Sequence, residues 1–146
     1  MAAKNIGVGV IGVGMGSTMF PLNKIADSPF VVKGIASQHE ERLKALDAQW
    51  GFGFCTTDYR KLIERKDIQV IGVYSPDHLH YEHCKAALEA GKHVVCTKPL
   101  TNNLEHAKEL VALVKKTGLK FLVGQTMRFD QQFLDHEVER GQAAEA

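Results

Sequence analysis

The sequence has almost no net charge, few cysteines and no long hydrophobic run, and each shortage excludes a class of protein. The formal charge is +1 over 146 residues, so nothing favours a nucleic-acid surface or an acidic substrate. No apolar stretch approaches the roughly 20 residues that span a bilayer. Met1–Asn5 runs straight into a strand-like pattern, without the features of a signal peptide. We therefore expect a cytoplasmic protein that binds neither nucleic acid nor membrane.

The cysteines are three in number, Cys55, Cys84 and Cys96, and they lack the CxxC spacing of metal and redox sites. They are typical of buried free thiols in a reducing compartment. Hydrophobic residues make up 45% of the chain and charged residues 24%, which is the balance of an ordinary soluble domain. A chain of this length forms one domain with a sizeable core.

Short apolar runs alternate with helical patterns along the whole chain. Expected helices include Leu43–Leu46, Tyr59–Ile63 and the clear 3.6-residue stripe of Leu104–Val114, which Gly118 ends. Strands joined by helices of this length indicate βαβ units and a parallel sheet. The fold class is therefore α/β, a doubly wound parallel sheet (Rossmann) with six strands in the order 3-2-1-4-5-6. The expected strands are Ile6–Ile11, Val31–Ala36, Phe52–Cys55, Val70–Tyr74, His93–Cys96 and Phe121–Val123.

Two glycine-rich frames compete near the N-terminus. Gly7, Gly9 and Gly12 match GxGxxG letter for letter, but they alternate with the apolar residues of the first expected strand. A pyrophosphate needs glycines at the turn from strand to helix, where backbone amides face the anion. The frame of Gly12, Gly14 and Ser17 lies at that turn, so we assign nucleotide binding to it. The alternative is a glycine-rich turn that binds nothing.

This second frame departs from the standard fingerprint at its third position. Ser17 stands where Gly or Ala is usual, and Gly16 can share that role. The hydroxyls of Ser17 and Thr18 are candidate donors to a phosphate. A GK[ST] ending is missing, which argues against a loop that hydrolyses a triphosphate.

The end of the second expected strand bears on the choice of cofactor. An acidic residue there holds the ribose 2′-OH of NAD, but this chain has Ser37. Candidate donors to a 2′-phosphate surround this position: Ser37, Gln38, His39 and Arg42. One charge-assisted hydrogen bond contributes about 1.5–3 kcal/mol, enough to decide between the cofactors. We therefore favour NADP, with NAD held by Glu40 or a backbone group as the alternative.

Histidines and a lysine follow the fourth and fifth expected strands. The run of His78, His80 and His83 suggests zinc, but no carboxylate or further ligand pair has suitable spacing, so we expect no metal. His80 is expected to cap or pack the loop near the cofactor. Lys98 ends a strand and is restricted to extended backbone by Pro99. It is a candidate proton donor to a substrate oxygen, against the alternative of a surface lysine before a turn.

Together these segments resemble the glucose–fructose oxidoreductase and inositol dehydrogenase family (Gfo/Idh/MocA). The matching stretches are Ser75-Pro76 to His80, Ala87 to Val94, Lys98-Pro99, and Val123-Gly124-Gln125 with Met127-Arg128-Phe129. The resemblance implies an oxidoreductase that transfers hydride between NAD(P) and a hydroxyl or carbonyl carbon of a sugar or cyclitol. It also implies that Lys98 is the catalytic lysine, and that Ser75, Pro76, His80, Lys98 and Gln125 line the cofactor pocket.

This sequence also departs from the family pattern. Thr97 replaces the Glu that the family usually has before Lys-Pro. Family members continue into a second domain that covers the substrate. We expect residues 1–127 to form the NAD(P)-binding domain, and residues 128–146 to be a helical segment that leads toward a substrate domain lying outside this chain. The alternative function is a dinucleotide-binding module without turnover, and formation of a homo-oligomer is left open.

Overall fold

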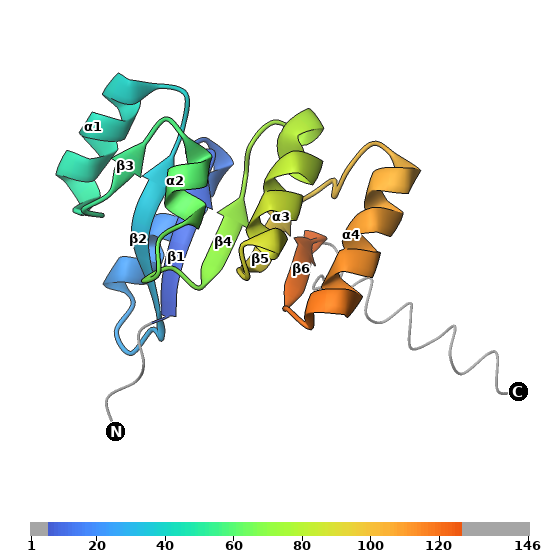
Figure 1. Ribbon diagram of the computed structural model, residues 1–146. Coiled ribbons are helices and arrows are strands. Elements are labelled where there is room, and N and C mark those ends of the chain that lie inside the picture. Colours follow the sequence, from blue (N-terminus) through green and yellow to red (C-terminus); the bar gives the residue numbers. More distant parts are fainter. Residues whose placement is uncertain (1–5, 127–146) are drawn as a thin grey trace, which may run out of the picture.

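Six parallel strands form one sheet in the order β3-β2-β1-β4-β5-β6 (Figure 1). The computed structural model describes residues 6–126, and the doubly wound α/β prediction is confirmed in its strand order. The strands are β1 (Ile6–Ile11), β2 (Phe30–Ala36), β3 (Cys55–Thr56), β4 (Val70–Val73), β5 (His93–Thr97) and β6 (Phe121–Gly124). Since all the strands are parallel, their carboxyl ends lie along the same edge of the sheet.

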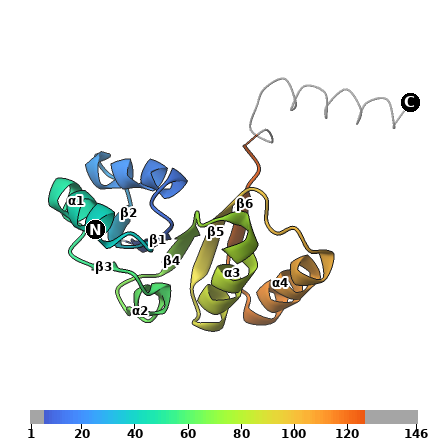
Figure 2. The same ribbon diagram turned by 90° about the horizontal axis from the view of Figure 1, so that it is seen from above.

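The helices divide between the two faces of the sheet (Figure 2). One face carries the 3-10 helix η1 (Met15–Lys24) and α1 (Glu40–Trp50), and the other carries α2 (Tyr59–Ile63), α3 (His80–Glu89) and α4 (Leu104–Thr117). A short 3-10 turn, η2 (Asp77–Leu79), precedes α3. Both faces of a parallel sheet must be covered because its strands are apolar on both sides.

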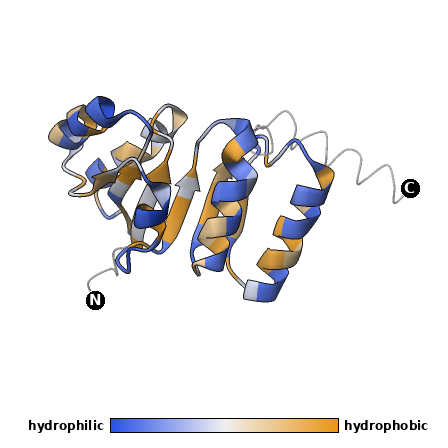
Figure 3. Ribbon diagram, turned by 45° about the horizontal axis from the view of Figure 1, so that its top comes forward, coloured by the Kyte–Doolittle hydropathy of each residue, from blue (hydrophilic) through white to orange (hydrophobic). Residues whose placement is uncertain are grey.

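Two hydrophobic cores result, one on each face of the sheet. Val10 and Ile35 pack with Phe20 of η1 and Leu43 of α1. On the other face, the larger core packs strand residues against α2, α3 and α4, including the fully buried Leu62, Ile71 and Leu88. Figure 3 shows the apolar colouring concentrated in the strands, with hydrophilic residues along the outer sides of α3 and α4.

The prediction for the third strand is wrong in its position. We expected Phe52–Cys55, but β3 is Cys55–Thr56. Gly53 has a φ of +78°, which breaks an extended run, and Phe52 is buried against Phe20 with ring centroids 4.8 Å apart. The extended segment therefore begins only after these residues.

The segment after β1 is a 3-10 helix. Pro21 lies inside η1 and has no N–H to donate to the preceding turn, which disfavours a regular α-helix there. The predicted end of the last helix is confirmed, because Gly118 has a φ of +67° just past α4, and Gly91 has a φ of +76° in the same place after α3.

The expected helical segment of residues 128–146 lies outside the described residues, as does the predicted domain boundary at Met127. Among the helices that the structure describes, none is both long enough and apolar enough to cross a bilayer.

Candidate functional site

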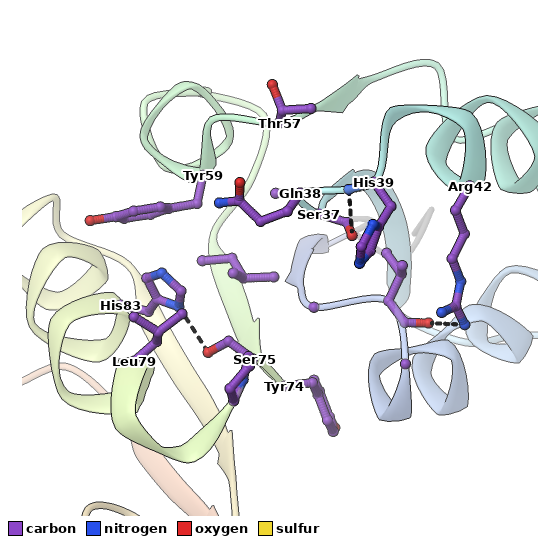
Figure 4. Close-up of a pocket in the computed structure, with 16 residues that line it drawn as sticks. Ser37, Gln38, His39, Arg42, Thr57, Tyr59, Tyr74, Ser75, Leu79 and His83 are labelled. Carbon is purple, nitrogen blue, oxygen red and sulfur yellow. Dashed lines mark hydrogen bonds between the residues drawn. The ribbon is translucent and has the colours of Figure 1, made fainter.

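A cavity of about 410 Å³ opens at the carboxyl ends of β1, β2 and β4 (Figure 4). This edge is where doubly wound sheets bind their ligands. Several predicted site residues line the cavity: Gly12, Gly14, Ser37, Gln38, His39, Arg42, Ser75 and Pro76. They come from three chain segments far apart in the sequence, which the parallel topology brings to one place.

The glycine turn after β1 fits a close approach by an anionic ligand. Gly12 has a φ of +91°, and a Cβ there would lie 2.4 Å from the carbonyl oxygen of Tyr74. A Cβ on Gly16 would lie 2.6 Å from Val10 Cγ1, so glycine lets η1 pack directly on β1, which is the role of the third fingerprint glycine. At Gly14 an added Cβ would meet nothing within 4 Å. The turn therefore leaves an open space that suits the pyrophosphate of a dinucleotide.

Two predicted phosphate donors are engaged with the backbone of η1. Ser17 Oγ donates to the carbonyl oxygen of Gly14 at 2.7 Å, and Thr18 Oγ1 donates to that of Met15 at 2.8 Å. Both residues lie outside the cavity lining. Their hydroxyl protons are therefore directed at carbonyl oxygens in the first turn of η1 and away from the cavity.

The end of β2 forms the more basic end of the cavity. The Arg42 guanidinium donates to the carbonyl oxygen of Val13 at 3.3 Å, which links α1 to the glycine turn. The backbone N–H of His39 donates to Ser37 Oγ at 3.4 Å. Ser37, His39 and Arg42 all line the cavity, and position 37 presents a hydroxyl in place of a carboxylate.

The opposite end of the cavity is aromatic and apolar. Tyr59 and His83 lie with ring centroids 4.2 Å apart, and Leu79 lies beside them in the lining (Figure 4). His83 Nδ1 is 2.8 Å from Ser75 Oγ. The lining also contains residues that the sequence did not indicate: Ile11, Val13, Ala36, Thr57, Tyr59, Tyr74, Leu79 and His83. Only Leu79 and His83 could have been found from the sequence, because they lie at the beginning of the helix that follows the β4 loop.

Burial lowers the pKa of the His83 imidazole, because a low-dielectric surrounding disfavours the charged ring. The carboxylate of Glu82 opposes this effect, whereas His80 and Arg60 add to it. The folded protein therefore holds His83 neutral over a pH range in which the unfolded chain protonates it.

We expect the free energy of unfolding to decrease as pH falls below about 6.5, the ordinary pKa of histidine. The unfolded state binds more protons there, so the stability is complete above pH 6.5 and is lost as pH falls toward the lowered folded pKa. Urea unfolding at pH 7.5, 6.5 and 5.5 measures this, and His83→Gln should flatten the curve. If the free energy of unfolding of His83→Gln fell as steeply with pH, the pH dependence would come from other groups.

The remaining predicted site residues lie outside the cavity lining. His80 is fully buried and contacts two backbone carbonyl groups. Lys98 follows β5 and is exposed, and Gln125 follows β6. Thr97 and Gly124 are register partners in the sheet, so Lys98 and Gln125 leave the same edge side by side. The described residues contain no group of three or more potential metal ligands.

Comparisons with known proteins agree with this geometry. Residues 6–125 match the family model described as an oxidoreductase family with an NAD-binding Rossmann fold. The chain is 31% identical over 136 residues to myo-inositol 2-dehydrogenase of Thermotoga maritima, covering 92% of this chain and 41% of that protein.

Two of the similar solved structures illustrate cofactors of different kinds. A levoglucosan dehydrogenase in complex with NADH and levoglucosan is 34% identical, with a TM-score of 0.73, covering 82% of this chain and 34% of that one. The Y186F mutant of KijD10, a 3-ketoreductase from Actinomadura kijaniata in complex with TDP-benzene and NADP, is 35% identical. Its TM-score is 0.73, and the match covers 82% of this chain and 37% of that one.

The chain spans about a third to two-fifths of the length of the curated relatives that it matches. The matched part contains the six-stranded sheet, the glycine turn and the cavity at its carboxyl edge. These features bind a nicotinamide dinucleotide in proteins of this kind. The chain therefore belongs to the Gfo/Idh/MocA oxidoreductase family, of which it forms the NAD(P)-binding Rossmann domain.

Proposed function

We propose that this domain binds NADP in preference to NAD, as the cofactor half of a dehydrogenase for a sugar or cyclitol. The proposed cofactor preference rests on the residues at the end of β2. Ser37 stands where an acidic residue would accept from the ribose 2′-OH, and His39 and Arg42 lie in the same part of the cavity lining. A 2′-phosphate would meet one positive side chain and no carboxylate from position 37.

Different parts of the cavity suit different parts of the cofactor. The open space at Gly14 takes the pyrophosphate, and the aromatic end at Tyr59, Leu79 and His83 takes the adenine ring, which stacks on flat apolar surfaces. Ser37 and Arg42 take the phosphate on the adenosine ribose. The bound cofactor supplies the hydride chemistry, while the protein supplies position and electrostatics.

Lys98 is the proposed catalytic residue. It extends from the carboxyl edge of the sheet after β5 and is exposed, so its amine is free to approach a substrate oxygen. Its role is to polarise that oxygen or to give it a proton. The relatives act on inositol and levoglucosan, which supports a substrate with several hydroxyl groups.

A second candidate function is dinucleotide binding without turnover. One observation favours it for this chain alone: the cavity is formed entirely within residues 11–83, whereas Lys98 lies outside its lining. Binding therefore needs the cavity alone, whereas chemistry also needs a surface that holds the substrate against Lys98.

We expect Ser37→Asp to reverse the cofactor preference. The new carboxylate repels a 2′-phosphate and accepts from a 2′-OH, so the ratio of the Kd values for NADP and NAD should change at least 10-fold toward NAD. That change corresponds to about 1.4 kcal/mol. Fluorescence titration with NADPH and NADH measures both constants.

Arg42→Gln and Lys44→Gln provide a matched pair on α1. Arg42 lines the cavity, whereas Lys44 lies outside its lining and pairs with Glu40 on the exposed side of the helix. Arg42→Gln should weaken NADPH more than NADH, and Lys44→Gln should change neither. Tighter binding of NADH than NADPH by the unmodified chain would contradict the proposed preference.

A further inference from the structure

Two buried histidines of α3 hold the loop that follows β4. His80 and His83 are three residues apart, so they lie on the same face of the helix, one turn apart. His83 Nδ1 lies 2.8 Å from the hydroxyl of Ser75, and His80 Nε2 lies 2.8 Å from the carbonyl oxygen of the same residue. Ser75 is itself 8% exposed, so both contacts are shielded from water.

His80 also reaches a second loop. Its Nδ1 lies 2.7 Å from the carbonyl oxygen of Pro99, the residue that follows Lys98. The ring therefore stands between two loops that leave the sheet from different strands, β4 and β5. Ser75 lines the cofactor cavity, whereas Pro99 and Lys98 lie outside it.

The chemistry of these contacts makes His80 difficult to replace. A backbone carbonyl oxygen only accepts hydrogen bonds, and imidazole is the side chain that presents two ring nitrogens on opposite sides. A neutral ring bonds one of the two carbonyl groups at a time, and a doubly protonated ring bonds both. His80 is 0% exposed, so neither loop can exchange this contact for water without movement of the helix.

We propose that His80 is a positioning residue that couples the cofactor loop at Ser75 to the segment that carries Lys98. The inference rests on the proposed function, because it assumes that Ser75 faces the cofactor and that Lys98 faces the substrate. It gives His80 a different role from lining the cofactor pocket: the ring lies outside the cavity lining and sets the position of Ser75 relative to Pro99.

The test uses three variants of the 146-residue chain. His80→Phe keeps a ring of similar size but donates no hydrogen bond. His80→Gln keeps one amide that can donate to one carbonyl group, and it serves if the Phe variant does not fold. Cys84→Ala is the matched control, because Cys84 is equally buried on the same helix and its truncation also disturbs the core.

Amide hydrogen exchange in the absence of cofactor tests the coupling directly. In His80→Phe we expect exchange at Tyr74–Leu79 and at Lys98–Thr101 to accelerate at least 10-fold, with a smaller increase in His80→Gln. In Cys84→Ala, exchange in both segments should stay within 2-fold of the unmodified chain. Unchanged exchange at Lys98–Thr101 in both His80 variants would overturn the proposal, and so would an equal increase in Cys84→Ala.

A titration with NADPH separates this inference from the proposed function. His80→Phe should weaken binding at least 10-fold because the Ser75 loop loses its support, whereas Cys84→Ala should bind within 2-fold of the unmodified chain. If the unmodified chain bound no dinucleotide while the exchange pattern held, the proposed function would fail and the coupling of the two loops would stand. Equal NADPH affinity in the His80 variants and the unmodified chain would refute a role for His80 in the cofactor site.

Discussion

Replacing Gly14 with Val is expected to weaken dinucleotide binding at least 100-fold while leaving the fold intact. Gly14 is exposed at the turn after β1 and lines the cavity, and a Cβ there meets no atom within 4 Å. A branched side chain would therefore occupy the space that we propose for the pyrophosphate, without disturbing the core. A 100-fold loss corresponds to about 2.7 kcal/mol. Isothermal titration with NADPH measures the affinity, and thermal unfolding checks the fold.

The neighbouring Met15→Val is the control for this experiment. Met15 is 59% exposed and lies outside the cavity lining, so the same new side chain one residue later should leave affinity unchanged. Gly12 would be a poorer choice, because its positive φ and its closeness to Tyr74 make any substitution there a test of folding. If Gly14→Val bound NADPH as well as the unmodified chain did, the pyrophosphate site would lie elsewhere.

The second large effect concerns turnover. We expect the 146-residue chain to bind cofactor but to show no dehydrogenase activity with inositols or levoglucosan. Holding the substrate in a reactive position can account for about 7–11 kcal/mol of a barrier, and the exposed Lys98 stands outside the cofactor cavity. A spectrophotometric assay of NADPH formation tests this. Turnover at the rate of a complete dehydrogenase would contradict it.

Lys98 can be tested in a fusion that contains a known substrate-binding domain. We suggest a fusion of residues 1–126 to the part of the Thermotoga maritima myo-inositol 2-dehydrogenase that this chain does not match. In an active fusion, Lys98→Ala should lower kcat about 10²- to 10⁴-fold, the range of general acid–base catalysis, with little change in cofactor affinity. Lys108→Ala is the control, because Lys108 is paired with Glu105 on the exposed side of α4. Equal kcat values for the Lys98→Ala and unmodified fusions would assign the chemistry to another residue.

Local patterns in the sequence were enough for the strand order and for the main turns. The strands β1, β2, β4, β5 and β6 lie where the sequence has short apolar runs between helical patterns. A buried parallel strand needs such a continuous apolar segment. The choice of the Gly12–Gly14 turn over the earlier frame of Gly7 and Gly9 agrees with a cavity at that turn. The third strand was misplaced because its two residues carry too little pattern, and their pairing depends on β2.

What the sequence alone determined is the doubly wound sheet and the edge of it that binds a ligand, since both follow from periodicity and from glycine at one turn. Only the tertiary structure decided which side chains come together at that edge. Tyr59 meets His83 because α2 and α3 pack on the same face of the sheet, and His80 at the start of α3 contacts both Ser75 and Pro99. The contacts of Tyr59 with His83 and of His80 with Pro99 join residues far apart in the chain, and such partners depend on helix rotation and strand register, which no local pattern encodes.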